Sequence, residues 1–103
     1  MLGLGKWKVN VDTKFYKGEA FLIIGEEDGE YNVRTELAGG KRPDFSFSNL
    51  RAEGNTITGT ARHSMLQGKM IPFSATFEDG KVSGFLDVPF VGMITIKDGV
   101  KVE

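Results

Sequence analysis

The sequence lacks cysteine and long apolar runs, and each absence excludes a class of structure or site. Without cysteine the chain has no disulfides, thiolate metal sites or cysteine nucleophile, a composition that fits a reducing compartment. No apolar stretch approaches the length of a transmembrane helix, and the first six residues are too short and too glycine-rich for a signal peptide. We therefore expect a cytoplasmic location.

The sequence also has no large excess of positive or negative charge. Thirteen basic and fourteen acidic residues give a formal net charge of -1. Nucleic acids and anionic membranes attract basic surfaces, so we expect neither as a partner. The single histidine, His63, excludes a multi-histidine metal site. The glycine-rich stretches separate predicted strands and open no helix, so they do not predict phosphate or dinucleotide binding, and we expect no cofactor.

Strand-forming residues and tight-turn signals dominate what is present. Fourteen glycines with only three prolines, together with many Phe, Val, Ile and Thr, are typical of strands and turns. The length of 103 residues predicts one domain over residues 1–103. We predict strands at residues 5–12, 18–26, 30–37, 43–52, 56–65, 69–78, 81–88 and 92–97, and a short tail after a turn at Asp98-Gly99.

Two Asp-Gly pairs predict strand registers. Asp28-Gly29 and Asp79-Gly80 suit two-residue type I′ hairpins, whose central residues both need positive φ. The first turn sets Ile24 opposite Val33, and the second sets Phe77 opposite Val82. In both hairpins the apolar residues then share one face, as the two-residue period of a strand requires.

The remaining hairpins are less regular. Around Gln67-Gly68 we expect a pairing that sets His63 opposite Ile71. The same pairing places Gly59, Ala75 and Gly84 in one row, which either leaves a cavity or is filled by Trp7.

A two-residue turn at Gly54-Asn55 would direct Phe45 and Phe47 outward. A β-bulge near Ser48-Asn49 would return both rings to the core, and we predict that bulge.

Connection lengths predict how the sheet is arranged. Three connections are tight, and the other four are longer: Thr13 to Lys17, Ala38 to Arg42, Met65 to Gly68 and Pro89 to Val91. In an up-and-down meander the two kinds gather at opposite ends. The layout therefore predicts an all-β fold, an eight-stranded antiparallel up-and-down (meander) barrel with a closed bottom and an open mouth. A sandwich or a partly open barrel is the alternative.

The first predicted strand opens with Gly5-Lys6-Trp7. This tripeptide, with the strand layout, resembles the Gly-x-Trp start of the calycins, which include lipocalins, fatty-acid-binding proteins and avidins. The resemblance implies a calycin-like barrel with Trp7 across the closed bottom, a basic side chain (Lys97 or Lys101) over it, and a small-molecule site. No segment predicts the C-terminal helix of lipocalins or the helical lid of fatty-acid-binding proteins.

Aromatic residues with a few polar groups gather at the predicted mouth, a composition typical of small-molecule sites. His63 could orient a ligand, act as an acid or base, or simply bond a backbone carbonyl. Arg42 could pair with a ligand carboxylate or with Asp44. Thr35 also points inward. The predicted ligand-binding residues are Tyr16, Arg42, Phe45, Phe47, His63, Met65, Phe73 and Phe90.

Three functions stay open at this point. The leading hypothesis is a barrel that binds a small, mostly apolar molecule. The second is a cofactor-free isomerase, cyclase or lyase with His63 as general acid or base. The third is an oligomeric structural module with a filled core. Outward-facing Phe21 and Ile23, with Phe85, Met70 and Met93, predict an interface, so we expect a homo-oligomer.

Overall fold

The computed structural model of the chain describes residues 2–12, 17–39, 45–64, 66, 69–89 and 92–102. None of these segments forms a helix long and apolar enough to cross a membrane. The predicted order of eight strands is confirmed, although the predicted beginning of the fourth and the end of the fifth extend beyond the described residues. The strands are β1 (Gly5–Asp12), β2 (Lys17–Glu27), β3 (Glu30–Leu37), β4 (Phe45–Glu53), β5 (Thr56–His63), β6 (Ile71–Glu78), β7 (Lys81–Val88) and β8 (Gly92–Lys101).

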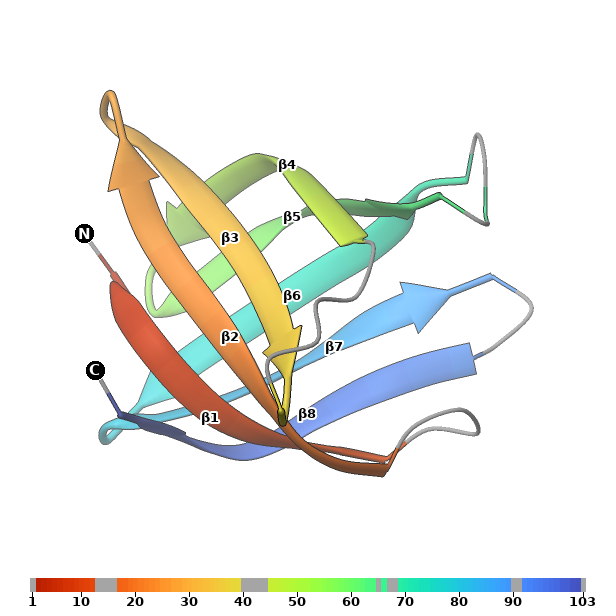
Figure 1. Cartoon of the computed structure of the whole chain (residues 1–103). Helices are drawn as coiled ribbons and strands as arrows, with labels where there is room; N and C mark the ends of the chain where they lie inside the picture. The colour runs from red at the N-terminus through yellow and green to blue at the C-terminus, as the bar shows by residue number, and fades with distance from the viewer. Residues whose placement is uncertain are drawn as a thin grey trace.

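All eight strands form one antiparallel sheet in the order β3-β2-β1-β8-β7-β6-β5-β4 (Figure 1). Strands β2, β5, β6 and β7 each lie between their sequence neighbours, and β1 and β8 pair with each other. The predicted up-and-down antiparallel order is therefore confirmed. The edge strands β3 and β4 lie near each other. No backbone ladder joins them within the described ranges.

Both Asp-Gly turns have the predicted geometry. The φ angles are 52° and 81° at Asp28-Gly29, and 52° and 75° at Asp79-Gly80. Positive φ at both central residues is the signature of a type I′ turn, which matches the twist of the flanking strands. The predicted registers follow, since Ile24 pairs with Val33 and Phe77 pairs with Val82.

The predicted bulge in β4 is confirmed. The register of β4 against β5 shifts between Ser48 and Arg51, and Asn49 has a φ of 54°. Asparagine is one of the few residues other than glycine that adopt this conformation readily. The extra residue turns Phe45 and Phe47 toward the core, against which both pack.

The predicted register between β5 and β6 is wrong by two residues. Ala61 pairs with Ile71 and Gly59 with Phe73, instead of His63 with Ile71 and Gly59 with Ala75. The same side chains still point inward, because a register shift of two residues equals one full repeat of a strand. The predicted glycine row is broken, and the space at Gly59 is filled by Leu50, whose Cδ2 lies 2.6 Å from the position of an added Cβ.

The predicted turn at Asp98-Gly99 is also wrong, because β8 continues through it to Lys101. The register of β8 shifts against both of its neighbours, between Lys8 and Asn10 of β1 and between Val82 and Gly84 of β7. A Cβ on Gly99 would lie 2.2 Å from Val82 Cγ1 and 2.8 Å from a Val9 methyl. Glycine therefore permits close packing inside a bulged strand here, and makes no turn.

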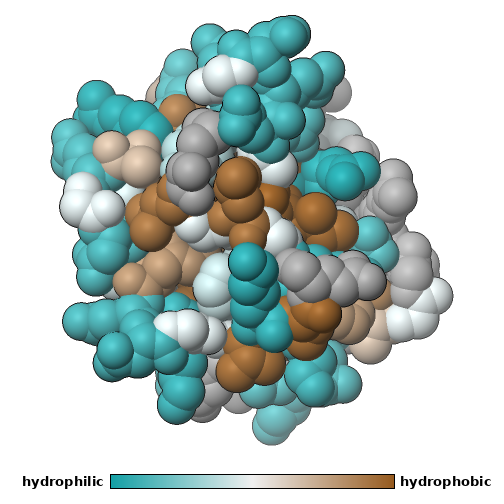
Figure 2. All heavy atoms as spheres, turned by 90° about the vertical axis from the view of Figure 1, so that its left-hand side faces the viewer, coloured by the Kyte–Doolittle hydropathy of each residue, from teal (hydrophilic) through white to brown (hydrophobic). Residues whose placement is uncertain are grey.

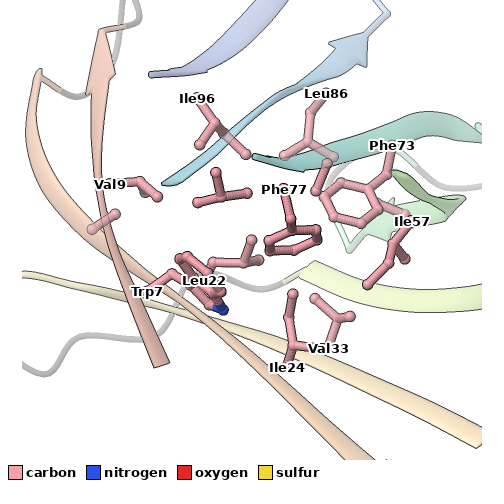
Figure 3. Close-up of a cluster of buried hydrophobic side chains, with 14 of the residues drawn as sticks. Trp7, Val9, Leu22, Ile24, Val33, Ile57, Phe73, Phe77, Leu86 and Ile96 are labelled. Carbon is pink, nitrogen blue, oxygen red and sulfur yellow. The ribbon is translucent and has the colours of Figure 1, made fainter. Parts of the chain in front are cut away.

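One apolar cluster fills the concave side of the sheet (Figure 3). No polar or charged residue among those described is fully buried. Strand β4 adds the half-buried Phe45, Phe47 and Leu50. The buried members are Trp7, Val9, Ala20, Leu22, Ile24, Val33, Ile57, Ala61, Ile71, Phe73, Ala75, Phe77, Val82, Leu86, Val88 and Ile96.

The three tight turns lie at one end of the sheet, which we call the turn end, and β1, β3, β5 and β7 finish at the other, the loop end (Figure 1). Residues 2–4, here called the N-terminal cap, lie against the turn end. Trp7 Nε1 donates a hydrogen bond to the Gly3 carbonyl at 2.8 Å, and Tyr31 Oη donates to the Leu2 carbonyl at 3.0 Å. Apolar groups occupy the middle of this end within a hydrophilic rim (Figure 2).

Trp7 is only 5% exposed and packs against Phe77, with ring centroids 5.0 Å apart. Gly3 lies directly under the Phe77 ring, because an added Cβ would be 2.6 Å from Phe77 Cζ. Of the two lysines expected near Trp7, Lys101 is its partner on β8 and Lys97 is opposite Asn10. In the described part of the chain, the ring contact to Trp7 comes from Phe77.

Candidate functional site

Two ring systems meet where β4 begins and β5 ends. Phe45 and His63 are register partners across this ladder, so their side chains project from the same face. Their ring centroids are 4.9 Å apart with an interplanar angle of 72°, an edge-to-face contact. Such geometry directs the positive edge of one ring at the negative face of the other.

Phe47 extends this contact deeper into the sheet. Its partner on β5 is Ala61, whose small side chain leaves room for the Phe47 ring to reach β6. Phe47 and Phe73 meet edge to face with centroids 5.1 Å apart, and Phe45 lies 6.4 Å from Phe47. We call Phe45, Phe47, His63 and Phe73 the aromatic cluster.

The aromatic cluster depends on the bulge in β4. With regular alternation from the Gly54-Asn55 turn, Phe45 and Phe47 would point to the outer face. The shift between Ser48 and Arg51 reverses their direction. The sequence thus adds one residue, with Asn49 in the left-handed region, to place two rings in the interior.

The interior is less completely covered at the loop end than deeper in the sheet. Val9 is 3% exposed, Val33 7%, Ile57 0% and Ile96 5%. On the same strands, the inward residues nearer the loop end are only half-buried. They are Val11, Thr35, Leu37, His63 and Ile94, and Phe45 and Phe47 of β4 have the same partial exposure. The coverage is not uniform, since Ala61 and Ile71 are fully buried at a similar height.

His63 is the last residue of β5. Because the described pairing with β6 ends at Ala61 and Ile71, His63 extends beyond that ladder. Its carbonyl accepts a hydrogen bond from the Leu66 amide at 2.9 Å, and the Leu66 carbonyl accepts one from the Lys69 amide at 3.1 Å. These bonds join Leu66 to the end of β5 and to Lys69.

Thr35 contributes a second polar group to the interior. It pairs with the buried Leu22 and follows Val33 at the two-residue spacing of one face, so its side chain points inward. Thr35 Oγ1 is buried and has no hydrogen-bond partner among the described residues. Alternation places Thr35 inside from sequence alone, but no sequence signal shows that its hydroxyl lacks a partner.

Of the eight predicted ligand-binding residues, four lie within the described residues and four lie outside them. The structure brings Phe45, Phe47, His63 and Phe73 together as predicted neighbours in the aromatic cluster. Leu66, which is not one of these eight residues, packs against the core soon after His63 in the sequence. The other four, Tyr16, Arg42, Met65 and Phe90, lie outside the described residues, as does Asp44.

The chemistry of this interior is neutral within the described ranges. The inward residues near the loop end offer aromatic and aliphatic surface, one imidazole and one hydroxyl. Across the described ranges, no three His, Asp or Glu side chains come together as a metal site would require. These side chains offer an apolar molecule aromatic and aliphatic contact surface, with few polar groups for hydrogen bonds.

A hollow lies on the outer face, over β2 and β3. It is lined by Gly25, Glu26, Glu27, Asn32 and Arg34, and Asn32 Nδ2 donates to Glu27 Oε2 at 3.4 Å. The lining is polar and charged, and the hollow is separate from the aromatic cluster. It offers no apolar enclosure.

Comparisons with protein families, with curated proteins and with solved structures found no match for this chain.

Proposed function

We propose that the sheet is a calycin-like barrel and that it binds a small, mostly apolar molecule inside its loop end. Two features support the barrel. The strand order leaves only β3 and β4 as edges, and these two strands lie near each other. The N-terminal cap covers the turn end, and Trp7 packs there as the resemblance to calycins implies.

The observation that carries the binding proposal is the partial exposure of three members of the aromatic cluster. Phe45, Phe47 and His63 project from the inward face and are only half-buried. Covering apolar surface stabilises a complex by roughly 25 cal/mol per Å². A ligand seated against these rings would remove that surface from water.

The residues have distinct roles in this proposal. The Phe45 and Phe47 rings provide the apolar wall, and the buried Phe73 packs against Phe47 and supports it. His63 orients the ligand through an imidazole nitrogen. Tyr16, Arg42, Met65 and Phe90 would line the entrance, as the sequence predicts.

Native mass spectrometry tests this function. We would spray the purified protein, alone and with the neutral fluorophore N-phenyl-1-naphthylamine, under native and then denaturing conditions. The proposal expects a one-to-one adduct that is lost on denaturation. Phe45→Ala should weaken the adduct at least about tenfold, because truncating a contacting ring removes more than about 1.4 kcal/mol. Val102→Ala is the matched control, since Val102 is 45% exposed and lies beside Lys6 at the turn end, away from the aromatic cluster. A bare wild-type mass at saturating fluorophore would contradict the proposal.

Apolar residues on the outer face support a homo-oligomer as a second property. Met70 and Met93 are 58% and 60% exposed, and Phe21 lies under Lys6, whose Nζ is 4.6 Å from the ring centroid. We propose that this face contacts a second copy of the chain, and the same spectra give the mass of the assembly. The acid–base role of His63 in an isomerase, cyclase or lyase and the cytoplasmic location stay predictions.

A further inference from the structure

The buried hydroxyl of Thr35 is the unexplained polar group of the interior. Buried hydroxyls in proteins are nearly always hydrogen-bonded, because a donor removed from water without a partner is destabilising. Thr35 Oγ1 has no partner in the described part of the chain. Valine has the same shape and a similar preference for strands, and it would avoid this cost. Packing alone therefore does not account for threonine at this position.

The surroundings of Thr35 limit what its partner can be. Its register partner is Leu22, which is 1% exposed, and its neighbours on the same face of β3 are Val33 and Leu37. No described inward residue near the loop end carries a fixed charge. From the described residues, a ligand carboxylate at the depth of Thr35 would gain no countercharge in return for its lost hydration, which is strongly unfavourable. A neutral oxygen has no such penalty.

Resting on the function proposed above, we propose that Thr35 binds the neutral oxygen of the ligand. The ligand class is a hydrocarbon skeleton with a ketone or alcohol group. Thr35 Oγ1 is covered in this structure although the residue as a whole is only half-buried, so binding requires a rotation about the Thr35 Cα–Cβ bond. After that rotation Oγ1 donates to the ketone oxygen, or exchanges a hydrogen bond with the alcohol, while the aromatic cluster packs against the hydrocarbon. The two sites face the same interior from opposite edges of the sheet, β3 and β4. Thr35 is then the residue that distinguishes an oxygenated ligand from its plain hydrocarbon.

The test compares two ligands that differ by one oxygen, indane and 1-indanone, against three proteins: wild type, Thr35→Val and Thr35→Ser. Each compound is titrated against bound N-phenyl-1-naphthylamine, and loss of fluorophore emission gives its affinity. We expect 1-indanone to bind Thr35→Val about two- to tenfold more weakly than wild type, the range of one net hydrogen bond. Thr35→Ser, which retains the hydroxyl, should stay within about twofold of wild type. Indane should bind wild type and Thr35→Val equally.

Thermal unfolding without ligand provides an independent measurement. If the Thr35 hydroxyl is unpaired in the free protein, Thr35→Val melts at the same or a higher temperature than wild type. A lower melting temperature would mean that the hydroxyl already has a partner, such as a buried water, and would overturn the inference.

The two proposals fail differently. Equal 1-indanone affinities for wild type and Thr35→Val overturn the role of Thr35 alone, and so does failure of 1-indanone to displace the fluorophore. No binding of the fluorophore to wild type overturns the proposed function, and this inference with it.

Discussion

Gly84 tests how closely the backbones of β6 and β7 approach each other. It lies on β7, faces the interior, and pairs with Ala75 of β6 and Ile96 of β8. A Cβ at this position would lie 2.0 Å from the Ser74 carbonyl oxygen and 2.9 Å from Ala75 Cα. Both contacts are to backbone, so no side-chain rotation relieves them. Gly84→Ala must therefore push β6 and β7 apart.

The expected cost follows from that displacement. An ordinary contact begins at 3.4 Å, so the oxygen must move by 3.4 − 2.0 = 1.4 Å if it moves directly away from the new methyl group. Overpacking a core costs about 1–3 kcal/mol and sometimes more. Because backbone must move here, we expect a loss of at least about 3 kcal/mol. Small domains have only about 5–15 kcal/mol in total, and the melting temperature should fall by about 12–24 °C.

Gly25→Ala is the matched control. Gly25 is also inside a strand, and the nearest atom to an added Cβ is the Asn32 carbonyl oxygen at 3.9 Å. Gly25 is not in the left-handed region. Alanine should therefore leave stability unchanged or raise it by about 0.4–1 kcal/mol, through a less flexible unfolded chain.

Urea unfolding followed by tryptophan emission measures both variants. Trp7 is the only tryptophan, and it is 5% exposed, so its emission should shift to longer wavelength on unfolding. The slope of free energy against urea should stay constant if only stability changes. Equal free energies of unfolding for Gly84→Ala and Gly25→Ala would refute the reasoning, because the close approach of β6 to β7 would then be absent.

Two further substitutions test the bulge and the N-terminal cap. Asn49→Val should lower the free energy of unfolding by about 1–3 kcal/mol, since a β-branched residue is strained at positive φ. Asn49→Gly should leave the free energy of unfolding nearly unchanged. Equal losses for the two variants in urea unfolding would argue against the bulge. Tyr31→Phe should cost about 1 kcal/mol by removing the hydrogen bond to the Leu2 carbonyl, and should have no effect in a chain without residues 1–4. Additive effects of the deletion and Tyr31→Phe would contradict a contact between the ring hydroxyl and the cap.

Sequence reasoning succeeded where local chemistry fixes the backbone. Asp28-Gly29 and Asp79-Gly80 have the predicted positive φ angles and registers. The same dipeptide at Asp98-Gly99 misled the prediction, because β8 runs straight through it. The difference lies in the packing of β8 between β1 and β7, which requires glycine for close approach. A dipeptide alone does not distinguish these two uses of glycine.

The register of β5 against β6 shows the limit of alternation. Two pairings that differ by two residues place the same side chains inside, so the apolar pattern cannot choose between them. The connection after His63 contains no two-residue turn signature that would decide. The structure pairs Ala61 with Ile71, which leaves His63 beyond the ladder and next to Phe45.

Half of the predicted site could be placed from sequence because alternation and one bulge determine where Phe45 and Phe47 point. The N-terminal cap could not be predicted from the sequence. Residues 2–4 form no strand and carry no motif. The available signal was indirect: a buried tryptophan N–H and a tyrosine hydroxyl each require an acceptor, and the Gly3 and Leu2 carbonyls supply them.

The pairing of β1 with β8 has a mechanical consequence. Trp7 lies opposite Lys101, and the Val102 amide donates to the Lys6 carbonyl at 2.8 Å, so the beginning and the end of the described chain leave the sheet side by side at the turn end (Figure 1). Antiparallel ladder bonds run perpendicular to the strands. Tension applied between the two ends would therefore load these bonds one at a time and peel β1 from β8 from the turn end onward. Sliding one strand past the other would load many bonds together, so this domain should open at low force despite its continuous sheet.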